Sequence, residues 1–82
     1  MITYLSASRV EIDIHQMQRA EAKKLLEHFL SSCNGNVREV TVIHGYGSGT
    51  VLRDMVRGGL KHHRIKRKIL SMNPGITILE LN

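Results

Sequence analysis

Two histidines in this chain directly follow apolar, β-branched runs, and both stand near residues that could support chemistry on a phosphate. His15 ends the alternating stretch 10–15, and Asp13 lies two residues before it. His44 follows the run 40–43 and opens the glycine-rich sequence His-Gly-Tyr-Gly-Ser-Gly. Histidine changes its protonation near neutral pH, and a carboxylate can orient water or bind a hard cation such as Mg²⁺. We therefore take Asp13, His15 and His44 as candidate catalytic residues for phosphodiester hydrolysis, with Asp13 as the candidate metal ligand.

The glycine-rich run after His44 predicts a tight turn between a strand and a helix. Glycine permits backbone conformations and close approaches that other residues do not, and the free N–H groups at the start of a helix attract anions. Two side chains in the turn also have structural interpretations, since Tyr46 could stack on a base or cover the sheet, and Ser48 is favoured as a helix N-cap. The turn residues that we expect to contact nucleic acid are Gly45, Tyr46, Gly47, Ser48 and Gly49.

The positive charge of the chain is concentrated in one segment. The net charge is +5, yet residues 53–68 alone hold seven Lys or Arg and one acid, so the rest of the chain sums to −1. A focused basic patch fits a polyanionic partner, and a solvated face is the alternative interpretation. The residues that we expect to bind DNA or RNA through this basic face are Arg53, Arg57, Lys61, Arg64, Lys66, Arg67 and Lys68.

Hydrophobic periodicity predicts an α/β chain, an α+β two-layer sandwich with the element order β-α-β-α-β-β. Right-handed crossovers make the first three strands parallel and place both helices on one face of a four-stranded mixed sheet. Asp13, His15 and His44 should then converge at the carboxyl ends of neighbouring strands, where open α/β sheets bind ligands. The predicted elements are strand 10–15, helix 17–33, strand 37–43, helix 50–63, strand 65–70 and strand 76–81.

The second predicted helix carries both an apolar and a basic side. Arg53, Arg57 and Lys61 recur every four residues and predict an outward basic stripe. Gly58-Gly59 conflicts with a helix interior. The residues expected to face inward are Leu52, Val56, Gly59 or Leu60, and His63.

Length and composition limit the chain to one small domain. Its 82 residues predict a single domain over 10–82, preceded by a segment 1–9 that is an N-terminal arm or an extra edge strand. One cysteine, Cys33, cannot form an internal disulfide, which favours a reducing cytoplasm. No apolar run reaches the length of a membrane span, and no leader is visible at the start. We expect no membrane partner, and the oligomeric state stays open.

The motifs described above resemble those of the Smr (small MutS-related) domain family. Its two signatures, a Leu-Asp-x-His strand and a His-Gly-x-Gly turn, correspond here to Ile12-Asp13-Ile14-His15 and His44-Gly45-Tyr46-Gly47. The similarity spans residues 10–81. The chain departs from the family pattern at Gln16, where a glycine is usual, in one extra residue before Leu52-Arg53, and in the short hairpin 71–75.

The resemblance implies a fold and a range of functions. The fold would be two helices on a four-stranded mixed sheet in the order 1-2-4-3, similar to the C-terminal domain of translation initiation factor three. Several members of the family nick DNA or cleave RNA, often with a divalent metal, and others only bind. The leading hypothesis is therefore a nucleic-acid-binding domain with endonuclease activity, supported by Mg²⁺ or another divalent cation. The alternatives are a non-catalytic module for structured RNA or branched DNA, and a protein-interaction domain.

Overall fold

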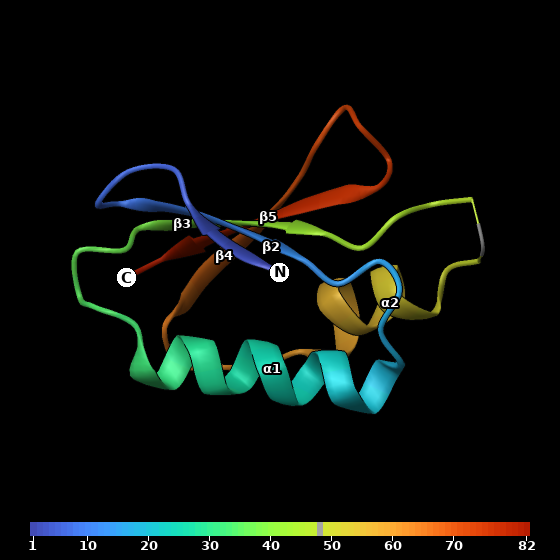
Figure 1. Ribbon diagram of the computed structural model, residues 1–82, viewed down its shortest axis with the longest axis horizontal. Helices are drawn as coiled ribbons and strands as arrows, with labels where there is room; N and C mark the ends of the chain where they lie inside the picture. The colour runs from blue at the N-terminus through green and yellow to red at the C-terminus, as the bar shows by residue number, and fades with distance from the viewer. Residues whose placement is uncertain (48) are drawn as a thin grey trace.

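A mixed β-sheet forms one layer of this protein, and the helices form the other layer on a single face of the sheet (Figure 1). The computed structural model describes residues 1–47 and 49–82. The five strands lie in the order β1-β2-β3-β5-β4. Within the described residues, no helix is long and apolar enough to cross a membrane. The elements are β1 (Ile2–Tyr4), β2 (Arg9–Asp13), α1 (Arg19–Ser32), β3 (Glu39–Ile43), α2 (Val51–Asp54), the π-helical turn η1 (Met55–Gly59), β4 (Ile65–Leu70) and β5 (Ile76–Leu81).

The arrangement follows the predicted β-α-β-α-β-β order, with one additional strand at the edge. β2 and β3 pair in parallel, and β5 lies antiparallel between β3 and β4. The expectation of four strands is wrong, because β1, within the segment 1–9, pairs antiparallel with β2 and makes a fifth. A strand of three residues is too short to produce an alternating pattern, so the sequence alone does not distinguish an arm from an edge strand here.

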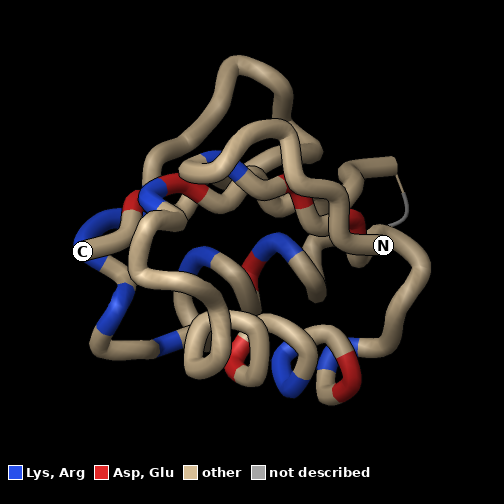
Figure 2. The backbone as a smooth tube through the Cα atoms, turned by 60° about the vertical axis from the view of Figure 1, so that its left-hand side comes forward, with Lys and Arg blue, Asp and Glu red and all other residues tan. Residues whose placement is uncertain are grey.

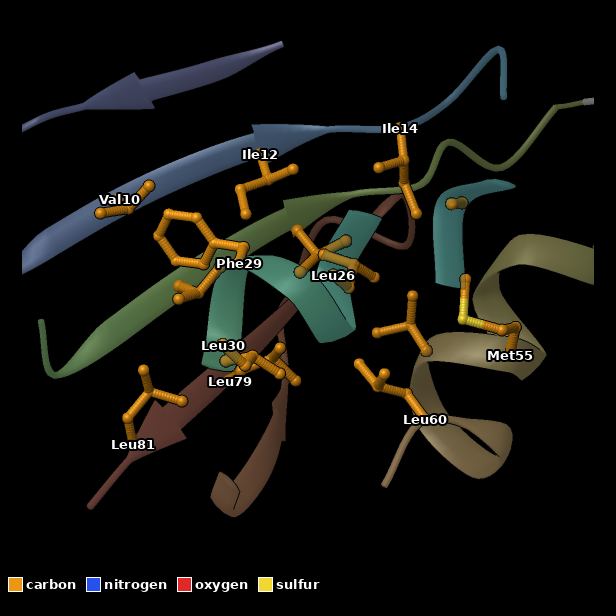
Figure 3. Packing of buried hydrophobic residues seen from close by; sticks show 14 of the residues in the cluster. Val10, Ile12, Ile14, Leu26, Phe29, Leu30, Met55, Leu60, Leu79 and Leu81 are labelled. Atoms are coloured by element: carbon orange, nitrogen blue, oxygen red, sulfur yellow. The ribbon is translucent and has the colours of Figure 1, made fainter. Parts of the chain in front are cut away.

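The core lies between the sheet and the helices, as Figure 3 shows. Val10, Ile12 and Ile14 are fully buried, which confirms the predicted inward face of the first long strand. Leu26 and Leu30 of α1 are buried in the same cluster. Burying each aliphatic side chain of this size contributes about 1.5–3 kcal/mol relative to exposure. Because this inward face is fixed, the alternate residues of β2 must face away from the helices.

The second helix is shorter than the sequence predicts. A helix over 50–63 is expected, but α2 passes after Asp54 into η1, which ends at Gly59. The N–H of Leu60 donates to the carbonyl of Met55, five residues back, at 2.6 Å, which is the spacing of a π-turn. The two glycines therefore lie at the end of the helical segment, and the apparent conflict of a glycine pair in a helix interior disappears.

The π-turn also changes which residues of this segment face the core. Val56 and Leu60 are fully buried, as predicted, and Leu52 is partly buried. His63 is exposed rather than inward, and Met55 is buried in the core although the periodicity did not select it. His63 lies beyond the end of η1 at Gly59, so the helical periodicity that predicted its inward position does not extend to it.

A lysine from the edge strand β4 binds the end of η1. Nζ of Lys68 donates to the carbonyl oxygens of Leu60 at 2.5 Å and Arg57 at 3.3 Å. The last carbonyls of a helix lack partners within the helix, and a cation is favourable there. Burial lowers the pKa of Lys68 below its ordinary value, with the nearby charge of Lys61 acting in the same direction. Lys68, expected from the sequence to contact phosphate, thus has partners within the protein.

The two glycines at the end of η1 should respond differently to alanine. A Cβ at Gly58 would meet no atom within 4 Å, whereas a Cβ at Gly59 would lie 3.1 Å from Nη2 of Arg19. Gly58→Ala should therefore raise the free energy of unfolding by about 0.4–1 kcal/mol, because it restricts the unfolded chain without strain in the fold. Gly59→Ala should give a smaller gain or a loss. Chemical denaturation of both variants measures this, and equal gains would show that the Arg19 contact is unimportant.

Candidate functional site

The loops after β2 and β3 meet at one end of the sheet. Asp13 pairs in register with Ile43, and the N–H of Ile14 donates to the carbonyl of Ile43 at 2.9 Å. A Cβ added to Gly45, whose φ is +78°, would lie 3.2 Å from Cβ of His15. Glycine is required at position 45 both for its left-handed backbone and for this close approach. The predicted convergence of the two histidine-bearing loops is confirmed.

Asp13 and His15 form a hydrogen-bonded pair on the outer side of this junction. Oδ1 of Asp13 lies 2.5 Å from Nδ1 of the His15 ring and accepts the His15 backbone N–H at 3.1 Å. The hydrogen bond from the ring is the main cause that lowers the pKa of the Asp13 carboxyl, against the opposing effect of burial. Both side chains are accessible, with 49% of the His15 side chain exposed. The pair therefore holds the imidazole through Nδ1 while about half of the His15 side chain stays exposed.

His44 lies in the interior, in contrast to His15. Only 4% of the residue is exposed, and both of its ring nitrogens lie within hydrogen-bond distance of protein atoms. Nδ1 lies 2.9 Å from the carbonyl oxygen of Gly45, and Nε2 lies 2.9 Å from Oγ1 of Thr77, which is fully buried. Burial lowers the pKa of His44, and the charges of Arg57 and Arg53 act in the same direction against the Gly45 hydrogen bond. His44 is therefore held as a neutral ring inside the protein.

A cleft of about 350 Å³ opens beside these residues, between the loop after β2 and the start of α2. Its lining combines the two histidines with two amide side chains, one cation and a partly apolar floor. Met17 contributes to the floor and packs against the core. The lining residues are His15, Gln16, Met17, Gln18, Arg19, His44, Gly49, Val51 and Leu52.

The glycine turn lies beside this cleft. Gly45 and Gly47 lie in the described part of the turn, Gly49 lines the cleft, and Ser48 lies outside the described residues. Tyr46 is 67% exposed at the turn. The backbone of Gly45 is tied to the β4–β5 hairpin, because the N–H groups of His44 and Gly45 both donate to the carbonyl of Gly75, at 2.9 and 3.1 Å.

Three residues of the predicted basic face are bound to other parts of the protein. Nε of Arg57 donates to Oγ1 of Thr77 at 2.8 Å, so Arg57 does not continue an outward stripe. Arg64 donates to the sulfur of Cys33 at 2.9 Å, and to the carbonyls of Val37 and Asn82, both at 3.1 Å. The third is Lys68, at the end of η1. The predicted stripe of Arg53, Arg57 and Lys61 is wrong, because the helix ends before Lys61 and Arg57 faces the sheet.

The remaining basic residues are more accessible and are spread over the molecule. Lys66 and Arg67 share Glu80 at 3.8 and 3.0 Å, and Arg53 lies 3.3 Å from Asp54. Figure 2 shows Lys and Arg positions on the helices and on the strands, rather than along one helix. The side chains of Lys66 and Arg67 are more than half exposed. The accessible basic residues therefore lie on both helices and strands and do not form one stripe along the second helix.

A comparison with protein-family models matches residues 12–76 to the Smr domain. The chain belongs to the Smr domain family. The match covers the Asp13–His15 pair, the glycine turn and the start of β5, and leaves β1 outside. Comparison with curated proteins and with solved structures gives no match.

The sequence alone did not identify two residues of this Smr domain site. Thr77 is the partner of His44, and its signal is weak: it is the polar member of the inward alternation Thr77, Leu79, Leu81 in the last strand. Arg19 lines the cleft, but in the sequence it is one of several cations at the start of α1. Neither role can be recognised until β5 and α1 are placed beside the turn.

The buried neutral state of His44 predicts a loss of stability in mild acid. Its pKa in the folded protein lies below the ordinary value of 6.5, so the unfolded chain takes up a proton more readily. The contribution of neutral His44 to the free energy of unfolding should therefore be complete above pH 6.5. The free energy of unfolding should fall as the pH drops below that value. Denaturant unfolding between pH 7.5 and about pH 5 measures the slope.

His62 provides the matched control for this measurement. Burial, His63 and Arg64 lower the pKa of His62, so it contributes in the same pH range. The decline should persist in His62→Gln. A flat profile in that variant would assign the pH dependence to His62 and contradict the account of His44.

Proposed function

We propose that this Smr domain binds nucleic acid and cleaves a phosphodiester bond at the cleft beside the glycine turn, with His15 as the group that moves the proton. The observation that carries the proposal is the Asp13–His15 pair, a carboxylate 2.5 Å from one ring nitrogen of an accessible histidine. The structure describes no hydrogen-bond partner for Nε2 of His15 within residues 1–47 and 49–82. That nitrogen is available to a water molecule or a substrate oxygen.

In the proposed step, His15 acts as a general base. A water oxygen attacks the phosphorus atom, the water proton passes to Nε2 of His15, and the bond from phosphorus to the leaving oxygen breaks. The leaving oxygen then takes a proton from solvent. Asp13 accepts the Nδ1–H hydrogen bond, orients the ring and stabilises the imidazolium that forms. The N–H of Gly45 already donates to Gly75, so the later N–H groups of the glycine turn and nearby cations would stabilise the charge on the phosphate oxygens.

His44, the third candidate catalytic residue, has a different role in this proposal. Both of its ring nitrogens have protein partners and the ring is buried. A proton carrier needs access to the reacting atoms. We therefore assign His44 to positioning the turn, and not to proton transfer.

The divalent cation implied by the family has little protein support at this site. Within residues 1–47 and 49–82, no group of three His, Cys, Asp or Glu side chains could hold a metal ion. Asp13 is the one candidate ligand, and its Oδ1 is already bonded to His15. These residues do not fit a metal centre built by the protein, so the proposed step does not pass through a metal. Each cleavage assay should be run with Mg²⁺ and with EDTA to measure the requirement directly.

The proposed partner is DNA or RNA, held at two levels of the fold. Arg19 and Arg53 lie near the cleft, while Lys66 and Arg67 lie toward the other end of β5. Four residues separate Glu80, which pairs with Arg67, from Ile76 at the site, or about 13 Å at the rise of a strand. Measured along the helix axis of a duplex, that span corresponds to about four phosphates of one strand. We propose that the nucleic-acid backbone is contacted by the glycine turn and by five basic residues, namely Arg19, Arg53, Lys61, Lys66 and Arg67.

A non-catalytic binding module is the second candidate function. The burial of His44 favours it, because it leaves one accessible imidazole where an acid and a base were expected. A purified domain that binds nucleic acid but cuts no substrate, with or without Mg²⁺, would establish this alternative. The single cysteine and the positive charge lead us to propose a cytoplasmic location in either case.

Replacing His15 tests the cleavage proposal. His15→Ala should lower the cleavage rate by about 10²-fold or more, the usual effect of losing a general base. Asp13→Asn should lower it less, because the imidazole remains but loses its charged partner. Binding of a labelled oligonucleotide should change little in both variants. Equal losses of binding and cleavage would show that the pair is structural.

Replacing Arg19 tests the backbone contact at the cleft. If about three phosphates are neutralised, the log–log salt slope of binding should be about −2.7. Arg19→Gln should reduce the magnitude of that slope by about one unit and weaken different sequences alike. Lys24→Gln is the control, because it removes the same charge from an exposed position of the same helix. Equal slopes for the two variants would remove Arg19 from the interface.

A further inference from the structure

We propose that Arg57 and Thr77 are positioning residues of the site, which hold the Nε2 side of the His44 ring in place and thereby fix Gly45 against His15. This inference rests on the proposed function for its cleavage readout alone. It replaces the phosphate contact that the sequence predicts for Arg57. It is carried by one continuous chain of contacts: Arg57 to Thr77, Thr77 to His44, and His44 to Gly45.

The two ends of this chain determine the direction of every hydrogen bond in it. The guanidinium of Arg57 can only donate, and its Nε lies 2.8 Å from Oγ1 of Thr77. The carbonyl oxygen of Gly45 can only accept, so Nδ1 of His44 must carry a proton to satisfy the 2.9 Å contact. A neutral ring then has a bare Nε2, which needs a donor. The hydroxyl of Thr77, 2.9 Å away, supplies it while its oxygen accepts from Arg57.

Charge and burial oppose any other arrangement of protons. Thr77 has no exposure and His44 has 4%, so a broken bond here would leave a polar group without water. The charges of Arg57 and Arg53 act against a second proton on the ring. Removing Arg57 should therefore both loosen the hydroxyl of Thr77 and allow His44 to take up a proton at higher pH.

The chain ends on the backbone that shapes the cleft. Nδ1 of His44 binds the carbonyl of Gly45, while the N–H of Gly45 is held by Gly75. Position 45 has a φ of +78°, and a Cβ added there would lie 3.2 Å from Cβ of His15, so the backbone of Gly45 lies close beside the proposed base. Arg57 is itself fixed by a second bond, from Nη2 to the carbonyl of Ile76 at 3.4 Å. A change at Arg57 thus reaches His15 without any contact to substrate.

The first test follows the His44 ring in Thr77 variants by ¹⁵N NMR, which needs no activity. Wild type should show the Nδ1–H tautomer. Thr77→Val keeps the shape but removes the donor to Nε2, so the Nε2 resonance should move to the position of a nitrogen without a hydrogen bond, while Nδ1 keeps its proton against the Gly45 carbonyl. The Gly45 amide should then exchange with solvent about tenfold faster, as expected for a lost hydrogen bond. Thr77→Ser should restore both. A wild-type Nε2 resonance and wild-type exchange in Thr77→Val would overturn the inference.

The second test separates positioning from phosphate contact. Arg57→Gln should leave the salt slope of binding equal to that of Lys24→Gln, which carries the same net charge, while His44 protonates at higher pH. Cleavage should fall by up to about 10²-fold, the effect of a misplaced catalytic group. A slope reduced by about one unit with an unchanged His44 ring would make Arg57 a phosphate contact and overturn the inference. If wild type cleaves nothing, the proposed function fails, but the NMR results still decide this inference.

Discussion

The parallel pairing of β2 with β3 is the constraint on which the rest of this structure depends. Their register sets Asp13 opposite Ile43, so the two chains leave the sheet at the same level. The bond from the Ile14 N–H to the Ile43 carbonyl continues the ladder beyond the strands. The turn after β3 could not be held near the other loop by its own residues, because a glycine-rich turn loses much conformational entropy on folding. The buried inward face of β2 and its packing on α1 supply that free energy.

At this junction the two histidines, similar in sequence context, have opposite environments. His15 stays accessible beside a carboxylate, whereas His44 lies in the core between Thr77 and Gly45. The difference arises because β5 places a hydroxyl at the inward position beside His44, whereas about half of the His15 side chain stays exposed. One imidazole can therefore exchange protons with a ligand, and the other maintains the geometry that the exchange needs. The same division explains why the pKa of His44 is lowered by burial.

Local sequence patterns were sufficient for most of the fold. Alternation predicted the inward residues of β2, the apolar stripe predicted α1, and the short turn predicted the β4–β5 hairpin. The family and the convergence of the two loops were also predicted correctly. The patterns failed where a tertiary contact decides the outcome. The end of the second helix depends on Lys68 from β4, and the fifth strand depends on pairing with β2 rather than on its own three residues.

The basic segment is a clearer case in which tertiary contacts decide what the sequence pattern cannot. Its charges were counted correctly, but charge in a sequence says nothing of the direction of a side chain. Arg57, Arg64 and Lys68 each donate to buried or backbone acceptors, which a flexible cation finds only after the strands are assembled. Thr77 was missed for the corresponding reason, since a hydroxyl in a β-strand has no local signal of its partner. Periodicity predicts which face a residue occupies, and the partner on that face is a property of the whole fold.

The central claim is that His15 meets the substrate while His44 holds the site together. The most direct measurement is ¹⁵N and ¹H NMR of both imidazole rings during titration with a non-cleavable phosphorothioate oligonucleotide. The account predicts that the His15 ring resonances shift with ligand concentration, while the His44 ring keeps its Nδ1–H tautomer throughout. The His15 resonances of the control variant Lys24→Gln should shift in the same way. Shifts at the His44 ring nitrogens together with an unperturbed His15 would contradict it.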